Sequence, residues 1–181
     1  MRVLLTSTGL ETKSINEKFI HMLKKDTKNV KALFIPTAAN YPQAIEVLPK
    51  CMNDLLACGI LTKNVEVFDL HTGMSLENLE QFDVVYLCGG DPKYLLERIN
   101  DTGFHQTFIE YIKKNGLVLG VSAGSIVFAN NYEDNLGLIP VPMDVHCEEG
   151  TPKGKVQFSK HDRIRLTNTS ALVIEDGVVI L

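Results

Sequence analysis

The sequence predicts an α/β protein with a three-layer α/β/α arrangement, in which helices cover both faces of a mostly parallel central sheet, and a C-terminal β-hairpin. Short apolar runs alternate with segments of helical periodicity through residues 1–121. The strand runs are almost wholly apolar, which is typical of strands buried on both faces. Near the end, residues 171–174 and 178–181 flank Glu175-Asp176-Gly177, whose Asp-Gly pair favours a tight hairpin turn.

The first half of the chain predicts two strands and two helices. Residues 3–6 form the first strand, and the helix that follows has four apolar residues on one face: Ile15, Phe19, Met22 and Leu23. Residues 32–35 form a second strand that ends at Pro36, because proline has no amide hydrogen to donate. One long helix follows and ends at Gly59, with apolar residues at helical spacing: Ile45, Leu48, Met52 and Leu55.

The second half predicts three more strands before the pattern changes. Residues 65–70 form a strand, and Ser75 starts a short helix that ends near Phe82. Residues 84–87 form the next strand, followed by a helix over about 93–99 and another that carries Phe104, Phe108 and Ile112. Residues 117–121 form the fifth strand, and residues 141–146 are strand-like again after a stretch richer in Pro, Gly and Asn.

Length and composition bound the class of protein. A chain of 181 residues that is 45% hydrophobic fits a single domain over residues 1–181. Its net charge of −4 is spread over interspersed charges, so we expect no nucleic-acid partner and no contact with a membrane. The chain lacks the apolar core of a signal peptide and any bilayer-length apolar stretch, which favours a cytoplasmic location. We expect free thiols and no metal, because the cysteines have no metal-type spacing: Cys51, Cys58, Cys88 and Cys147.

Ser122 has the strongest chemical signal in the chain. The apolar run 117–121 ends in Gly-X-Ser-X-Gly, and a helix-like run follows, which is the pattern of a nucleophile elbow. In such a turn, small neighbours allow a sharp bend that lifts the serine hydroxyl above the sheet edge. The backbone N–H of Ala123, at the start of the helix, is then a donor for a developing oxyanion, with help from the helix dipole.

The loops after the other strands supply candidate partners for this serine. Gly89 and Gly90 follow the fourth strand, and either N–H could be a second oxyanion donor; a tight turn that needs positive φ is the alternative. His146, at the end of the 141–146 run, is the candidate general base, because an imidazole titrates near neutral pH. Packing or solvation is the alternative for His146, and we expect the other histidines at the surface: His21, His71, His105 and His161.

The acidic residue that would orient His146 stays open among three carboxylates. Glu133 and Asp134 lie in the loop after the elbow, whereas Asp144 would share a strand face with His146. Such a carboxylate would hold the imidazole ring and stabilise its protonated form.

These motifs together resemble the dipeptidase E (aspartyl dipeptidase, peptidase S51) family, whose larger relatives are the cyanophycinases. The residues that carry the resemblance are Gly120-Val121-Ser122-Ala123-Gly124-Ser125, preceded by Cys88-Gly89-Gly90-Asp91-Pro92-Lys93-Tyr94-Leu95-Leu96 and followed by Asp144-Val145-His146. The likeness runs from the first strand to the last hairpin. It implies a fold like that of class I glutamine amidotransferases, with Ser122 in place of their cysteine, His146 as the histidine, and the acidic residue near Glu133 or Asp134.

The sequence departs from the family's pattern in three places. The segment between elbow and histidine is shorter, and Gly89-Gly90-Asp91 stands where the family usually has a third glycine or Gly-Gly-Asn. Ser159-Lys160-His161 stands where the family has a Thr-Arg-Glu-like stretch associated with the substrate's acidic side chain. Lysine keeps the charge but loses arginine's bidentate fork, so the resemblance implies Lys160 as a substrate-binding residue with a weaker preference for N-terminal aspartate. A solvated surface lysine is the alternative.

The sequence therefore favours a serine-type peptidase that hydrolyses short peptides through an acyl-enzyme on Ser122, with no metal or other cofactor. We expect a small peptide substrate and a monomer or homodimer. Two alternatives remain open. An esterase or amidase could use the same elbow, and a non-catalytic binding or regulatory protein could keep the fold without a working triad.

Overall fold

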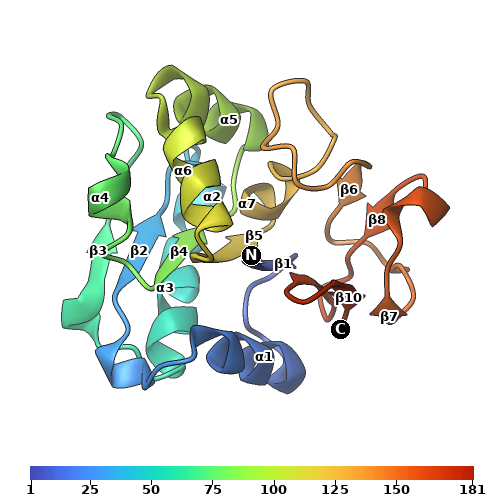
Figure 1. Ribbon diagram of the computed structural model, residues 1–181, viewed down its shortest axis with the longest axis horizontal. Coiled ribbons are helices and arrows are strands. Elements are labelled where there is room, and N and C mark those ends of the chain that lie inside the picture. Colours follow the sequence, from blue (N-terminus) through green and yellow to red (C-terminus); the bar gives the residue numbers. More distant parts are fainter.

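The computed structural model describes residues 1–181, and an eight-stranded sheet in the order β3-β2-β4-β5-β1-β9-β10-β7 forms its centre (Figure 1). Strands β3, β2, β4, β5 and β1 are parallel, whereas β9 runs antiparallel to β1. The strands of this sheet are β1 (Arg2–Thr6), β2 (Ala32–Ile35), β3 (Val65–Val67), β4 (Val84–Leu87), β5 (Leu117–Val121), β7 (Gly154–Lys155), β9 (Ala171–Ile174) and β10 (Val178–Ile180).

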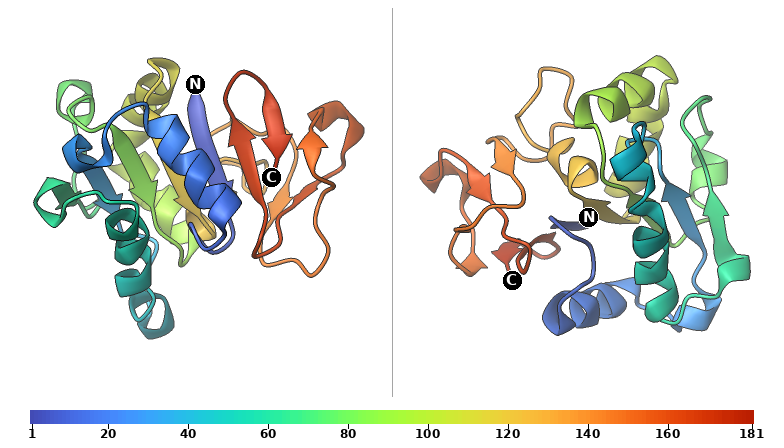
Figure 2. Two further views of the ribbon diagram at one scale, coloured as in Figure 1. Left: turned by 90° about the horizontal axis from the view of Figure 1, so that it is seen from below. Right: turned by 180° about the vertical axis from the view of Figure 1, so that it is seen from behind.

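Helices cover both faces of the sheet, which confirms the predicted three-layer α/β/α class (Figure 2). The helices are α1 (Lys13–Leu23), α2 (Pro42–Ile45), α3 (Leu48–Ala57), α4 (Leu76–Leu79), α5 (Pro92–Asp101), α6 (Phe104–Lys113) and α7 (Ala123–Ile126). Successive residues of β1 serve opposite cores: Leu4 packs with residues of α1 and α3, and Leu5 with residues of α5 and α6. Both leucines are fully buried, as the apolar strand pattern predicts.

Local capping sets where the helices begin. Thr12 caps α1 by accepting a hydrogen bond from the backbone N–H of Ile15, and Asp91 caps α5 by accepting from those of Lys93 and Tyr94. Pro92 occupies the first turn of α5, where its missing N–H costs nothing. The loop that carries Gly89 and Gly90 is therefore fixed between the end of β4 and a strongly capped helix.

Three elements differ from the sequence prediction. The single helix expected from Ile45 onward is two helices, α2 and α3, because Pro49 lies in the first turn of α3, where a helix readily begins. The third strand ends at Val67 instead of residue 70, at the exposed edge of the sheet. Within the 141–146 run, only Met143–Asp144 forms a strand, β6. This strand pairs in parallel with β8 (Ile164–Arg165) outside the main sheet.

The predicted hairpin of β9 and β10 extends the sheet beside β1 and is tied to α1 by charge. In its turn, the Glu175 carboxylate lies 2.7 Å from the Lys18 ammonium and 3.3 Å from that of Lys24. The hydrogen bond from Lys18, with its positive charge and that of Lys24, lowers the pKa of Glu175. The longest helix, α1, has 11 residues, and no helix combines the length and apolar character needed to cross a membrane.

Candidate active site

Ser122 lies in the sharp turn between β5 and α7, with φ 51° and ψ −111°. Such a positive φ is rare for a residue with a side chain and costs of order 1–3 kcal/mol. Two contacts with β1 hold the turn: the Ser122 N–H donates to the Thr6 carbonyl (2.9 Å), and the buried Ser125 hydroxyl lies 2.8 Å from the same oxygen. This is the strained strand-to-helix elbow that the sequence predicts.

Gly124 lets the elbow pack directly against the end of β4. A Cβ atom at this position would lie 2.3 Å from the Leu87 carbonyl oxygen, so no larger residue fits without a backbone shift. The helix behind the elbow, α7, has only four residues, and its dipole is therefore weaker than the sequence interpretation assumed. The candidate oxyanion donor on this side is therefore the Ala123 N–H itself rather than the dipole of a long helix.

His146 is within hydrogen-bond distance of the candidate nucleophile. Its Nε2 lies 3.0 Å from Ser122 Oγ, although the two residues are on different loops. The backbone of His146 has φ 58°. Its N–H donates to the hydroxyl of Ser7 (3.1 Å), which itself donates to the Leu166 carbonyl (3.1 Å). The buried residue directly after β1 therefore fixes the histidine over the serine.

The third residue of the arrangement is Asn168, which the sequence reasoning missed. Its side-chain oxygen lies 2.9 Å from His146 Nδ1. When Ser122 donates to Nε2, the ring proton is on Nδ1 and Asn168 accepts it. Thr8 Oγ1 donates to the Asn168 carbonyl (2.9 Å), so the loop after β1 positions both partners of the serine.

A topological signal could have indicated Asn168. It lies just before β9, and β9 runs antiparallel to β1. The start of an antiparallel strand lies at the same sheet edge as the ends of the parallel strands, where ligands gather. A side-chain amide carries no charge, so a pattern that predicts an acidic partner for His146 does not indicate it.

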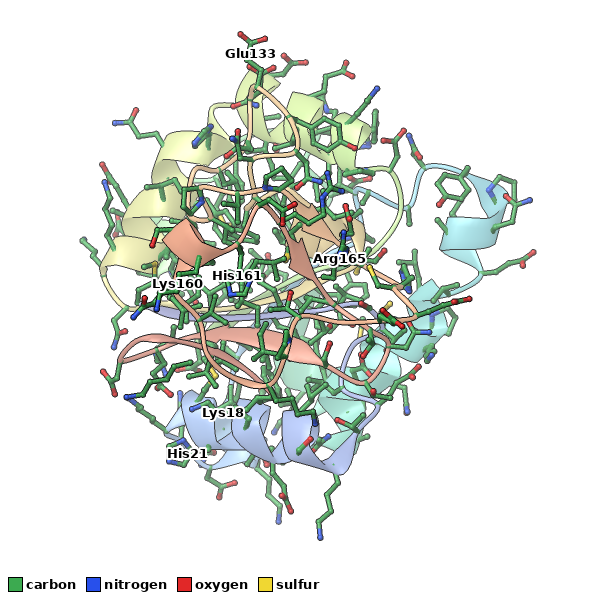
Figure 3. The ribbon with its side chains drawn as sticks, turned by 90° about the vertical axis from the view of Figure 1, so that its right-hand side faces the viewer. Lys18, His21, Glu133, Lys160, His161 and Arg165 are labelled. Atoms are coloured by element: carbon green, nitrogen blue, oxygen red, sulfur yellow. The ribbon has the colours of Figure 1, made fainter.

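The structure does not bring the three candidate carboxylates to His146. The loop of Glu133 and Asp134 folds back onto α5, where Asn100 Nδ2 donates to the Asp134 carbonyl (3.3 Å), and both residues line a separate cavity. Figure 3 shows Glu133 at one extremity of the molecule, pointing outward. Asp144 instead accepts a hydrogen bond from Arg163 (2.6 Å).

Gly89 and Gly90 lie beside the serine, as the sequence predicts for oxyanion donors. A Cβ on Gly89 would lie 3.2 Å from Ser122 Cβ. Gly90 has φ 142°, and a Cβ there would lie 1.9 Å from the Ala38 carbonyl oxygen. The backbone N–H groups of Gly89, Gly90 and Ala123 donate no hydrogen bond within the chain, so they are available to an oxyanion at Ser122.

A cavity of about 230 Å³ opens beside Ser122. Its polar lining consists of Ser7, Thr8, Gln43, Lys50, Ser122 and His146, and its apolar side of Tyr41, Ala44, Val47, Leu48, Cys51 and Val121. The Lys50 ammonium pairs with Glu11, and this hydrogen bond raises the pKa of Lys50. A hydrogen bond with Cys88 lowers the pKa of the Cys51 thiol to about 7, against the opposing effect of burial.

Lys160 is not among the residues that line this cavity. It is the exposed last residue of a 3₁₀ turn (Phe158–Lys160), and Figure 3 shows it beside His161 on the C-terminal part of the chain. The cation that reaches the cavity is Lys50, from α3. No group of three or more His, Cys, Asp or Glu side chains is arranged to hold a metal ion.

The sequence profile of Peptidase family S51 matches residues 3–138. That range contains the glycine loop and the elbow but ends before His146, Asn168 and the hairpin. The predicted resemblance is therefore carried by the first three quarters of the chain.

Individual relatives agree with the profile at low identity. The chain is 26% identical over 139 residues to the uncharacterized peptidase Lmo0363 of Listeria monocytogenes, covering 77% of this chain. It is also 26% identical over 148 residues to peptidase E of Salmonella arizonae, covering 74% of this chain. In both cases the match spans 62% of the relative's own length.

Solved structures share the fold. A crystal structure of a candidate peptidase E from Listeria monocytogenes superposes with a TM-score of 0.73 at 22% identity, covering 99% of this chain and 97% of that one. A peptidase from an acI-B1 Actinobacterium gives a TM-score of 0.67 at 19% identity, covering 99% and 86%. At these identities the likeness concerns the path of the chain, including the C-terminal part that the family profile does not match.

Proposed function

The chain belongs to peptidase family S51, and from this premise we propose that it is a serine-type peptidase that hydrolyses short peptides through an acyl-enzyme on Ser122. One observation carries the proposal: the hydroxyl of a strained elbow serine lies 3.0 Å from His146 Nε2. A serine needs such a base, because its hydroxyl is a weak nucleophile at neutral pH.

The proposed reaction follows from the positions of these groups. Ser122 attacks the scissile carbonyl while His146 takes its proton, and the N–H groups of Ala123 and of Gly89 or Gly90 hold the oxyanion. His146 then gives the proton to the leaving amine. Water hydrolyses the acyl-enzyme by the same steps, with His146 again acting as the base.

Asn168 has the role of the orienting residue in this proposal. A Ser-His-Asn arrangement parallels the Cys-His-Asn triads of papain-like proteases, in which an amide holds the imidazole. The amide oxygen fixes the ring and its tautomer but adds no negative charge beside the imidazolium that forms during attack. We therefore expect a slower enzyme than one with a carboxylate at this position.

The size of the cavity favours small substrates. A volume of about 230 Å³ lies below the usual range of sites for drug-sized ligands, roughly 300–1,000 Å³, so a short peptide fits better than a folded polypeptide. The same machinery would also cleave an ester or amide whose acyl group fits the cavity.

Labelling with a fluorophosphonate and hydrolysis of dipeptides, p-nitroanilides and p-nitrophenyl esters test the proposal together. We expect labelling and turnover by the wild type and neither by Ser122→Ala, whereas Ser159→Ala, which alters an exposed serine far along the chain, leaves both unchanged. Turnover of the p-nitrophenyl esters alone would support an esterase instead of the proposed peptidase. Equal labelling of wild type and Ser122→Ala, without turnover, would instead support the alternative of a non-catalytic binding protein.

A further inference from the structure

The cavity beside Ser122 has an apolar wall that the proposed chemistry does not use. Residues 41–51, which form α2, the joint after it and the start of α3, contribute two polar residues, Gln43 and Lys50, and five apolar ones: Tyr41, Ala44, Val47, Leu48 and Cys51. Tyr41 is 43% exposed and Val47 48% exposed, so two large apolar side chains are uncovered next to the nucleophile. A bound group that covers them gains the free energy of removing apolar surface from water.

The charges around the cavity do not suit an ionised side chain. Lys50 is the only lysine or arginine in the lining, and its ammonium already pairs with Glu11. A carboxylate entering the cavity would have to compete with Glu11 for that ammonium or lose its hydration without a partner. No aspartate or glutamate lines the cavity, so a cationic side chain finds no partner there either.

The break between α2 and α3 directs Val47 toward the cavity. Val47 is the residue directly before α3, and its backbone is helical but outside both helices. Ile45, the last residue of α2, is equally exposed at 51% but does not line the cavity. The two aliphatic residues are thus a matched pair: they share chemistry, exposure and neighbourhood, and differ in contact with the site.

We propose that this wall is the subsite for the side chain of the acyl residue, and that it takes an uncharged aliphatic or aromatic group in preference to an acidic or basic one. The inference rests on the proposed function, because only an acyl-enzyme on Ser122, which also lines the cavity, gives this wall an acyl side chain to hold.

The test compares leucine, phenylalanine, asparagine, aspartate and lysine p-nitroanilides with wild type, Val47→Asp and Ile45→Asp. We expect the wild type to cleave the leucine and phenylalanine substrates at least tenfold more efficiently in kcat/KM than the aspartate one. Tenfold corresponds to covering roughly half of a leucine side chain. Val47→Asp should lower kcat/KM for leucine about tenfold, mainly through KM, and raise it for lysine, while Ile45→Asp resembles the wild type.

Equal or faster cleavage of the aspartate substrate would overturn the inference, as would the same loss in Val47→Asp and Ile45→Asp. A readout without turnover separates this inference from the proposed function. Calorimetric binding of leucine amide and of aspartate amide to the Ser122→Ala protein should show the same preference for leucine. Tighter binding of aspartate amide than of leucine amide would refute the proposed apolar subsite even if Ser122 is the nucleophile. If leucine amide binds to the Ser122→Ala protein but the wild type hydrolyses none of the substrates, only the proposed catalysis is refuted.

Discussion

Replacing Asn168 by aspartate should accelerate the reaction. The Asn168 side-chain oxygen accepts from His146 Nδ1 at 2.9 Å, and Asn168→Asp keeps that acceptor while adding a negative charge. In the proposed reaction, this charge would stabilise the imidazolium that forms when Ser122 loses its proton. Asn168→Ala should have the opposite effect, because it removes the acceptor and releases the ring.

The magnitude follows from the hydrogen bond and its surroundings. A neutral hydrogen bond contributes about 1 kcal/mol net and one to a charged group about 1.5–3 kcal/mol, so the gain is about 0.5–2 kcal/mol. Coulomb's law for unit charges about 4 Å apart gives about 1 kcal/mol in water and about 4 kcal/mol near a protein surface, and exposed Asn168 lies toward the lower value. At about 1.4 kcal/mol per factor of ten, kcat/KM should rise roughly 2- to 30-fold.

The assay is the pH dependence of kcat/KM for one p-nitroanilide with wild type, Asn168→Asp, Asn168→Ala and Thr169→Asp. The carboxylate favours the protonated imidazole, so the acidic limb of the Asn168→Asp profile should move to higher pH. Thr169→Asp places the same charge on the next exposed residue without contacting the ring, and should change neither limb. A rate for Asn168→Asp as low as for Asn168→Ala, or the same gain in Thr169→Asp, would refute the assigned role of Asn168.

Three further outcomes are expected. Ser122→Ala and His146→Ala should each abolish hydrolysis, with a double variant little worse than either, because the two groups act as one unit; single-turnover rates measure this. Gly124→Ala should destabilise the protein by about 1–3 kcal/mol in urea unfolding, since its Cβ would meet the Leu87 carbonyl at 2.3 Å. Glu175→Gln should cost about 0.5–1 kcal/mol at pH 7. Because pairing lowers the Glu175 pKa from its ordinary 4.5, this difference should be complete above that pH and disappear as the pH falls further.

The parts of the fold that were predictable are those fixed by short-range pattern. Apolar runs such as Leu117–Val121 identify strands buried on both faces, and the elbow motif locates Ser122 within one residue of a strand end. Pro36 and the Asp-Gly pair at Asp176 mark boundaries through their own backbone preferences. These signals are local, and tertiary packing reinforces them.

The parts that were not predictable depend on contacts between distant segments. The helical spacing of apolar residues continues from Ile45 to Leu55 across the break between α2 and α3. Periodicity alone therefore predicts one helix where there are two. The 141–146 run has apolar residues, but Pro140 before it and Pro142 within it have no N–H to donate to a neighbouring strand. A long strand therefore does not form there. Asn168 reaches His146 only because β9 docks antiparallel on β1, a pairing that joins the two ends of the chain.

Cys51 bears on how the protein responds to inhibitors of different protease classes. Its thiol has a pKa lowered to about 7 and lines the same cavity as Ser122, although Cys51 is only 6% exposed, so we expect iodoacetamide that enters the cavity to alkylate it. Alkylation there should block the cavity and stop the proposed turnover without modifying the serine. Inhibitor profiling alone would then class the proposed serine peptidase as thiol-dependent. The Cys51→Ala variant should be active and resistant to iodoacetamide but still sensitive to fluorophosphonate. This result would assign the nucleophile to Ser122 rather than to a thiol.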